Sequence, residues 1–136
     1  MHIDYEDVLE LPNGKELTPK NLFNHAFKVI GGRWPEAEPH IMKEPGSAYS
    51  YAVNVIKGRW PEAEPHIMIN SAHAYHYAKY VINGRWPKAE PIIMQAPYSA
   101  YSYARFVIKG RWPEAESHIM KDPDEWYKYR KHFGIS

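Results

Sequence analysis

The chain repeats itself with a period of 26 residues. The tetrapeptide Gly-Arg-Trp-Pro occurs four times, beginning at Gly32, Gly58, Gly84 and Gly110. Residues 32–42 and 58–68 are identical at all eleven positions. A repeat this short forms one small structural unit, which has to bury its apolar face against neighbouring copies. The period therefore limits the fold to a stack of equivalent units.

The first half of each repeat, which we call helix A, has the signals of a helix start. In the first copy we expect a helix from about Pro35 to Met42, because proline suits the first helical position. Glu36 and Glu38 would then lie in the first turn, where the helix dipole favours negative charge. Pro39 is near the limit that a first turn tolerates, and Ser117 replaces it in the fourth copy.

The second half, which we call helix B, has a helical pattern of apolar residues from about Pro45 to Lys57. These residues recur at i, i+3, i+4, i+7 and i+8 as Ala48, Tyr51, Ala52, Val55 and Ile56. A Tyr-x-Tyr pair recurs in every copy, and its members fall on opposite sides of the helix. Helix B is therefore expected to be covered on both sides, as it would be between adjacent repeats. Gly58 is expected to end it as a left-handed C′ residue, and Asn70 and Asp122 are good N-caps.

These patterns predict an all-α fold, a right-handed, solenoid-like stack of short helix pairs that forms a single domain over residues 1–136. Residues 18–31 align with helix B and form half a repeat. The full repeats are residues 32–57, 58–83, 84–109 and 110–136, and residues 1–17 are expected to form an N-terminal cap. The last repeat departs from the pattern at Trp126, Arg130 and Gly134, as a terminal cap does, with Lys128 and Lys131 contributing to its polar face.

Composition excludes several classes of protein. The formal net charge of +1 does not fit a strongly basic nucleic-acid binder. The chain has no Cys, so it has no disulfide, thiol nucleophile or Cys-ligated zinc site. The segment Met1–Glu10 is acidic and does not resemble a signal peptide, and no apolar run approaches the ~20 residues of a membrane helix. We therefore expect a cytoplasmic protein that makes no contact with a membrane.

The block Gly-Arg-Trp-Pro-Glu-Ala-Glu-Pro-x-Ile-Met, followed by Ala-Tyr-x-Tyr-Ala and Val-Ile, resembles short tandem repeats in proteins of bacteriophages and bacteria. The resemblance covers about residues 18–133 and implies no activity. If it holds, the chain works in the cytoplasm of a host cell, where a host factor or defence component would be a reasonable target. The paired helices are similar in architecture to tetratricopeptide and Sel1-type solenoids, whose periods are longer.

Each Trp of the repeated block follows an arginine, which gives a ladder of Arg33, Arg59, Arg85 and Arg111. One interpretation is a row of guanidinium and indole groups that binds phosphates or stacks on bases. The other is structural, because carboxylates follow each arginine at i+3 and i+5, except that Lys88 replaces the first in the third repeat. We favour the structural interpretation, since only the third repeat is basic and phosphate binding needs several contacts.

No residue pattern predicts catalysis or a metal site. His40, His66 and His118 share one position in the repeat, but stacked helices lie ~8–10 Å apart, too far for ladder positions to chelate one ion. The pair His73 and His76 supplies only two ligands. The serines of helix B lack a His-Asp partner that spacing could place. We expect no enzyme activity, no cofactor and no metal.

One stripe of helix B differs from copy to copy while the rest is nearly constant. Its positions follow i, i+3, i+7 and i+10 and read Ser-Ser-Asn-Lys, His-His-Tyr-Asn, Ser-Ser-Phe-Lys and Glu-Lys-His-Ile in the four copies. This divergence is either drift on a solvated face or a surface that recognises a partner. The recognition hypothesis places a protein-binding site at His73, His76, Lys79, Tyr80, Ser102, Arg105 and Phe106.

The sequence thus favours a non-enzymatic protein-binding or scaffold module. Two alternatives stay open at this point. One is nucleic-acid or nucleotide binding along the arginine ladder, and the other is a self-assembling structural protein. The sequence does not identify the partner or the oligomeric state.

Overall fold

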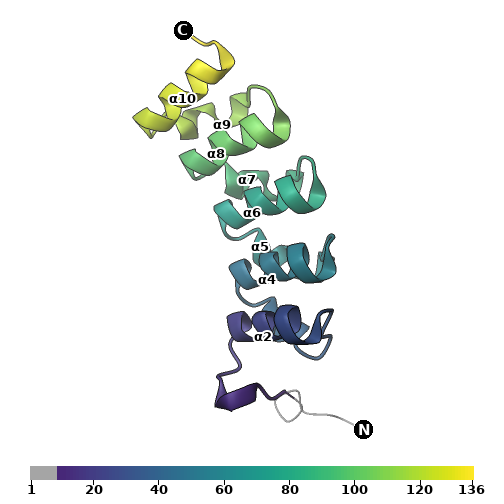
Figure 1. Cartoon of the computed structure of the whole chain (residues 1–136). Coiled ribbons are helices and arrows are strands. Elements are labelled where there is room, and N and C mark those ends of the chain that lie inside the picture. Colours follow the sequence, from purple (N-terminus) through teal and green to yellow (C-terminus); the bar gives the residue numbers. More distant parts are fainter. Residues whose placement is uncertain (1–8) are drawn as a thin grey trace. The chain divides into compact units, whose positions relative to one another are not determined.

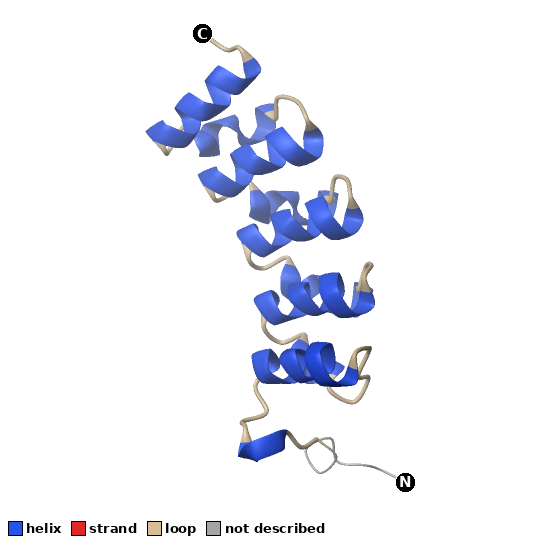
Figure 2. Ribbon diagram, viewed as in Figure 1, coloured by secondary structure: helices blue, strands red, loops and turns tan. Residues whose placement is uncertain are grey.

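The computed structural model describes residues 9–136, and these residues contain helices and loops but no strand (Figures 1 and 2). The predicted all-α class of short, stacked helix pairs is confirmed. The chain divides into two compact units, Met1–Ile67 and Met68–Ser136. The division falls between helix A and helix B of the second repeat. The sequence-based prediction of a single domain stays a prediction.

The first unit consists of the half repeat, the first repeat and helix A of the second. Its elements are η1 (Pro12–Gly14), α2 (Pro19–His25), η2 (Ala26–Ile30), α3 (Glu38–Ile41), α4 (Pro45–Tyr51), η3 (Ala52–Ile56), η4 (Pro61–Ala63) and α5 (Glu64–Ile67). Helix α2 packs against both α3 and α4, and α4 packs against α5. The half repeat predicted at residues 18–31 is therefore a helix B that stacks on the first repeat, as the alignment indicates (Figure 1).

The second unit begins with helix B of the second repeat. Its elements are α6 (Ser71–Tyr77), η5 (Ala78–Ile82), η6 (Pro87–Ala89), α7 (Glu90–Ile93), α8 (Pro97–Tyr103), η7 (Ala104–Ile108), α9 (Pro113–Ile119) and α10 (Pro123–Phe133). Successive B helices lie side by side, with α8 in contact with both α6 and α10. Helix α7 packs on α6 and α8, and α9 packs on α8 and α10.

Helix A is shorter than predicted in the first three copies. Instead of a helix over Pro35–Met42, the α-helix α3 covers four residues, and turn residues precede it. A second proline, Pro39 in the first copy, has no N–H to donate to the turn before it, so the α-helix begins only there. The fourth copy has Ser117 at this position, and its helix α9 runs over seven residues from Pro113. The second proline, or its absence, therefore decides how long the α-helical part of helix A is.

Helix B changes its hydrogen-bonding pattern before it ends. Its last five residues, Ala52–Ile56 in η3, form a π-helix, and the N–H of Lys57 donates to the carbonyl of Ala52 at 2.7 Å. The left-handed residue is then Lys57, with a φ of 60°, and not Gly58 as predicted. Asn83 and Lys109 occupy the same conformation. Gly58 follows directly, and its N–H donates to the same carbonyl of Ala52 at 3.2 Å.

The core is built from the same positions in every copy. An alanine and an isoleucine of helix A and a tyrosine of helix B are fully buried in every full repeat, and the first three repeats add buried alanines of helix B; the first repeat has Ala37, Ile41, Tyr51 and Ala52. The buried alanines keep neighbouring helices close together, and the aromatic residues fill the remaining space. The repeats are therefore held by nearly the same set of core residues, except that Trp126 and Arg130 replace the helix B alanines in the fourth repeat.

The two ends of the described chain differ from this pattern. Leu9 is buried and Pro12–Gly14 forms a short 3₁₀ turn, while residues 1–8 of the predicted N-terminal cap lie outside the described residues. Helix α10 is α-helical throughout and ends at the left-handed Gly134. The predicted N-caps are confirmed, since Asn70 accepts from the N–H of His73 and Asp122 accepts from that of Glu125. No helix in residues 9–136 has the length and apolar character needed to cross a membrane.

Candidate functional site

Each arginine of the ladder makes a two-pronged ion pair with the glutamate five residues later. In the third repeat, Nε and Nη2 of Arg85 donate to the two carboxylate oxygens of Glu90 at 2.8 and 2.9 Å. Tyr103 of helix B donates its hydroxyl hydrogen to the same carboxylate at 2.6 Å and accepts the N–H of Trp86 at 2.8 Å. This network ties helix A to helix B of the same repeat.

The same arrangement recurs along the chain and perturbs the groups that form it. Arg33 pairs with Glu38, Arg59 with Glu64 and Arg111 with Glu116, all at 2.8–3.0 Å. The hydrogen bond from Arg85 is the largest influence on Glu90 and lowers the pKa of that carboxyl, with Tyr103 adding to the effect. Burial, followed by the hydrogen bond to Glu116, raises the pKa of Tyr129 to about 12. Glu90 is therefore charged and Tyr129 neutral over the physiological range.

The tryptophans that follow the arginines are packed inside the stack. Trp60, Trp86 and Trp112 are at most 3% exposed, and each ring centroid lies 4.8 Å from that of a helix B tyrosine. Trp34 is less buried, because the half repeat has His25 in place of tyrosine and that ring lies 5.2 Å away. The indole rings thus serve packing and are not presented to bases.

These contacts weaken the alternative that the ladder binds phosphates. Two donors of each guanidinium already bind a carboxylate that neutralises its charge, although the arginine side chains stay about half exposed. A phosphate would have to displace a bidentate ion pair that is itself held by a buried tyrosine. The structural interpretation of the ladder agrees with this geometry.

The variable stripe of helix B is exposed over only part of its length. Its positions in and just after η3, η5 and η7 are exposed, whereas those nearer the helix start are buried or half-buried in the first three repeats. Ser102 is 4% exposed, so it cannot belong to a binding surface as the sequence suggested. His73 and His76 are half-buried, and burial lowers the pKa of His76. Tyr80 and Phe106 are 54% and 41% exposed and remain as candidate contact residues.

Four of the predicted residues form a compact cluster, which we call the aromatic–basic surface: Lys79, Tyr80, Arg105 and Phe106. Nζ of Lys79 lies 4.8 Å from the ring centroid of Tyr80 and 4.2 Å from that of Phe106. The guanidinium of Arg105 lies 4.9 Å from the Phe106 ring. The imidazole of His76 stacks on Tyr80 at 6.1 Å. Cation–π contacts therefore join η5 of one repeat to η7 of the next.

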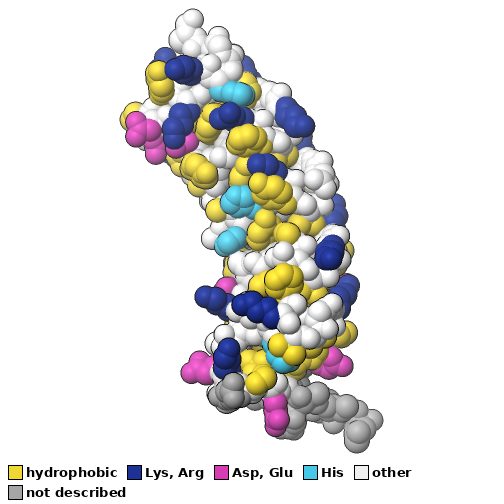
Figure 3. All heavy atoms as spheres, viewed as in Figure 1, with side chains coloured by type: hydrophobic (Ala, Val, Ile, Leu, Met, Phe, Trp, Pro, Cys, Tyr) yellow, Lys and Arg dark blue, Asp and Glu magenta, His cyan; other side chains and the backbone are white. Residues whose placement is uncertain are grey.

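Two shallow clefts flank the aromatic–basic surface within the second unit. The first, of about 230 Å³, is lined by Lys79, Asn83, Gly84, Phe106, Val107 and Lys109. The second, of about 360 Å³, is lined by Tyr101, Arg105, Tyr127, Lys128, Lys131 and His132. We call them the η5–η7 cleft and the η7–α10 cleft. The space-filling view shows hydrophobic, basic and histidine side chains side by side over part of the chain (Figure 3).

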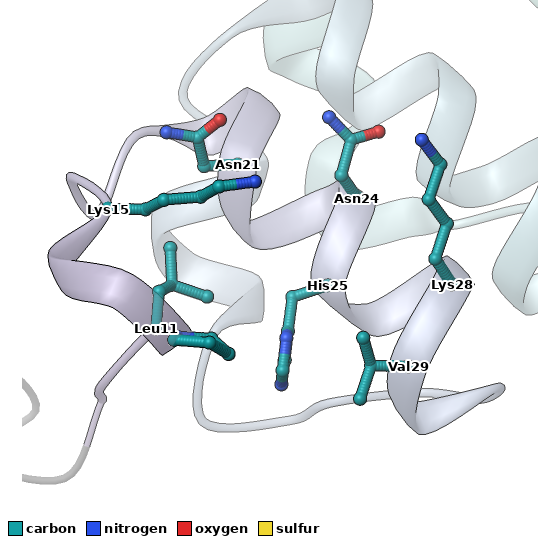
Figure 4. Close-up of a pocket in the computed structure, with 8 residues that line it drawn as sticks. Leu11, Lys15, Asn21, Asn24, His25, Lys28 and Val29 are labelled. Atoms are coloured by element: carbon teal, nitrogen blue, oxygen red, sulfur yellow. The ribbon is translucent and has the colours of Figure 1, made fainter.

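A separate cavity of about 180 Å³ lies in the first unit between η1 and helix B of the half repeat (Figure 4). Its lining includes Lys15, Asn21, Asn24, His25 and Lys28. Asn21 already donates to the carbonyl of Glu16 at 3.1 Å, and its backbone N–H is capped by Thr18. The residues predicted as a binding site lie elsewhere, and the sequence offers no signal that singles out this cavity.

No group of three or more His, Asp and Glu side chains within residues 9–136 could hold a metal ion. No protein-family model, curated protein or solved structure matches this chain. The resemblance to bacteriophage and bacterial repeats therefore stays a prediction, and the case for a function rests on the geometry of the chain itself.

Proposed function

We propose that this chain is a non-enzymatic protein-binding or scaffold module whose partner docks on the aromatic–basic surface. The observation that carries the proposal is the exposure of Tyr80 and Phe106 on adjacent π-helical segments. The tyrosines that hold the stack together, such as Tyr77 and Tyr103, are fully buried. Tyr80 and Phe106 are therefore additional to the core, and their large apolar surfaces are available to a second protein.

The composition of the surface supports a protein as the partner. Aromatic residues and arginine are the types most enriched at the centres of protein interfaces, where a few of them supply most of the binding energy. Lys79 and Arg105 already lie against the rings, which restricts their conformations before a partner arrives. A preordered surface loses less conformational entropy on binding than a flexible one.

The stacked repeats also supply a rigid base for this surface. Tyr80 and Phe106 are carried by η5 and η7, which contact one another. The helices that precede them are fixed by the buried tyrosine and alanine layers. Repeat proteins generally bind partners on a face formed by equivalent positions of successive copies, and this surface has that arrangement.

Affinity capture from a cell lysate tests the proposal. The chain carrying Tyr80→Ala and Phe106→Ala should lose the partners that the wild type retains. Met120→Ala is a matched control, because Met120 is 51% exposed in the same unit but lies outside the surface. Retention of every captured partner by the double variant would contradict the proposal. Loss of capture after nuclease treatment would instead favour nucleic acid.

A further inference from the structure

Basic groups extend well beyond the four residues of the aromatic–basic surface. The η5–η7 cleft contains Lys79 and Lys109, and the η7–α10 cleft contains Arg105, Lys128 and Lys131 together with His132. Among residues 9–136, no Asp or Glu lines either cleft. The clefts meet at the consecutive residues Arg105 and Phe106, which line one cleft each. Cationic groups therefore continue on both sides of the exposed aromatic rings.

One cation of the η7–α10 cleft forms an ion pair with a carboxylate. Glu125 pairs with Lys128 at 3.3 Å, and its side chain is only 10% exposed. The hydroxyl of Tyr80 raises the pKa of Lys79, which keeps that amine charged. Over residues 68–136 the sequence has ten Lys and Arg against six Asp and Glu, so the second unit is basic although the whole chain is nearly neutral. The positive charge is thus concentrated in the unit that carries the surface.

We infer that the two clefts and the aromatic–basic surface bind an acidic segment of a partner protein, with an apolar side chain seated against Tyr80 and Phe106. This inference rests on the proposed function and adds the chemical class of the partner. Carboxylates in the clefts would pair with Lys79, Arg105 and Lys131. Complementary charge of this kind raises the rate of association and excludes basic partners.

The geometry favours an acidic polypeptide over a nucleic acid. A base that stacks on an aromatic ring needs a whole open ring face, whereas an apolar side chain can pack against the part of the ring that is exposed. The Phe106 ring already has the Lys79 amine 4.2 Å and the Arg105 guanidinium 4.9 Å from its centroid. A carboxylate can bind these cations where they are, without uncovering the ring. Tyr101 further fixes Arg105 by accepting a hydrogen bond from its Nη1 at 3.1 Å.

Selection from a displayed library of random peptides tests the inference with the intact chain as bait. Peptides that the wild type retains should be enriched in Asp and Glu around an aromatic or aliphatic residue. For one selected peptide, fluorescence anisotropy should show Kd rising at least about tenfold in Lys79→Gln with Arg105→Gln. Raising the salt concentration should also weaken binding, because the screening length falls from about 10 Å at 0.1 M to about 3 Å at 1 M.

The control for net charge is Lys88→Gln with Lys121→Gln, since both lysines are exposed in the same unit and line neither cleft. This control should change Kd by less than about twofold. An equal loss of affinity in both charge variants would overturn the inference, because the effect would then be one of overall charge. Circular dichroism and urea unfolding of each variant separate lost binding from lost folding.

Other outcomes distinguish failure of the inference from failure of the proposed function. Neutral or basic selected peptides that still require Tyr80 and Phe106 would overturn the acidic partner and leave the protein-binding role standing. Selected peptides that require no residue of the aromatic–basic surface would overturn both. Displacement of an acidic peptide by a tighter-binding single-stranded oligonucleotide at the same residues, or self-association of the free chain through them, would also overturn the inference.

Discussion

The hydroxyl of Tyr103 lies 2.6 Å from Oε2 of Glu90 and donates a hydrogen bond that joins helix B to helix A of the third repeat. The hydroxyl oxygen of Tyr103 also accepts the N–H of Trp86. Tyr103 thus satisfies a backbone donor and fixes a carboxylate that also binds Arg85. Tyr51 and Tyr129 make the same two hydrogen bonds in the first and fourth repeats, so this tyrosine position contributes to the cohesion of those repeats as well.

Replacement of Tyr103 by phenylalanine should lower the free energy of unfolding by about 1–3 kcal/mol, because it leaves a buried N–H and a carboxylate oxygen without their partner. Urea unfolding measures the loss. Tyr98→Phe is the matched control, since Tyr98 is 60% exposed. It should change the free energy by less than about 0.5 kcal/mol. Equal effects of the two substitutions would contradict the structural role of the hydroxyl.

The repeated networks predict a loss of stability in acid. The pKa of Glu90 is lowered chiefly by the hydrogen bond from Arg85, and that of Glu116 chiefly by the hydrogen bond from Arg111. Below about pH 4.3 the unfolded chain therefore takes up protons that the folded chain does not, and the free energy of unfolding decreases. Urea titrations at successive pH values measure this decrease in the free energy of unfolding. A free energy that stayed constant from pH 5 down to pH 3 would contradict the prediction.

The tyrosines of the same networks predict a second loss in alkali. The pKa of Tyr129 is raised to about 12, mainly by burial and then by the hydrogen bond to Glu116. Between about pH 10 and pH 12 the unfolded chain ionises while the folded chain does not, so stability falls as the pH rises. Tyrosinate absorbance near the unfolding transition measures this ionisation. Tyr129→Phe should show a smaller alkaline decrease, and an unchanged decrease would argue against the assignment to this residue.

The left-handed residues at the ends of helix B predict stabilising substitutions. Lys109 has a φ of 62°, which costs a residue with a side chain about 1–2 kcal/mol. Lys109→Gly should therefore raise the free energy of unfolding by about 0.5–1 kcal/mol, measured by thermal or urea unfolding. Asn83→Gly should raise the free energy of unfolding by less, since asparagine tolerates the left-handed conformation. Destabilisation by Lys109→Gly, or an equal gain at both positions, would contradict this account.

Replacement of different tryptophans should lower the free energy of unfolding by different amounts. Trp86 is 3% exposed and packs against Tyr77, so Trp86→Ala should lower the free energy of unfolding by about 3–5 kcal/mol. Trp34→Ala should cost less, because Trp34 packs against His25 and is less buried. Urea unfolding of both variants tests the ranking. A larger loss of stability for Trp34→Ala than for Trp86→Ala would contradict the weaker packing of Trp34 against the half repeat.

Much of the fold could be predicted because the same residue pattern occurs in four copies. The apolar spacing around Tyr51 predicts a helix covered on both sides, and four copies of the pattern leave little ambiguity. The change to a π-helix at Ala52 could not be foreseen, since α- and π-helices share nearly the same side-chain pattern over five residues. For the same reason the sequence predicts the left-handed residue at Gly58, whereas Lys57 adopts that conformation.

The candidate site was predicted less completely than the fold. Divergence between copies correctly singled out Tyr80 and Phe106 as exposed, because the comparison separates the constant core from the variable face. Divergence between copies does not distinguish a buried position from an exposed one. The predicted site therefore included Ser102, which is buried. The two clefts depend on residues of α10 and of neighbouring repeats, such as Lys131, whose convergence only the three-dimensional structure brings out.

Hydrogen–deuterium exchange of the chain with and without a captured partner tests the docking surface most directly. The account predicts slower exchange on complex formation in η5, η7 and the second half of α10, with little change in α7 and α9. Protection confined to α7, α9 and the arginines that precede them, with η5 and η7 unchanged, would contradict the claim that the exposed face of helix B is the binding surface.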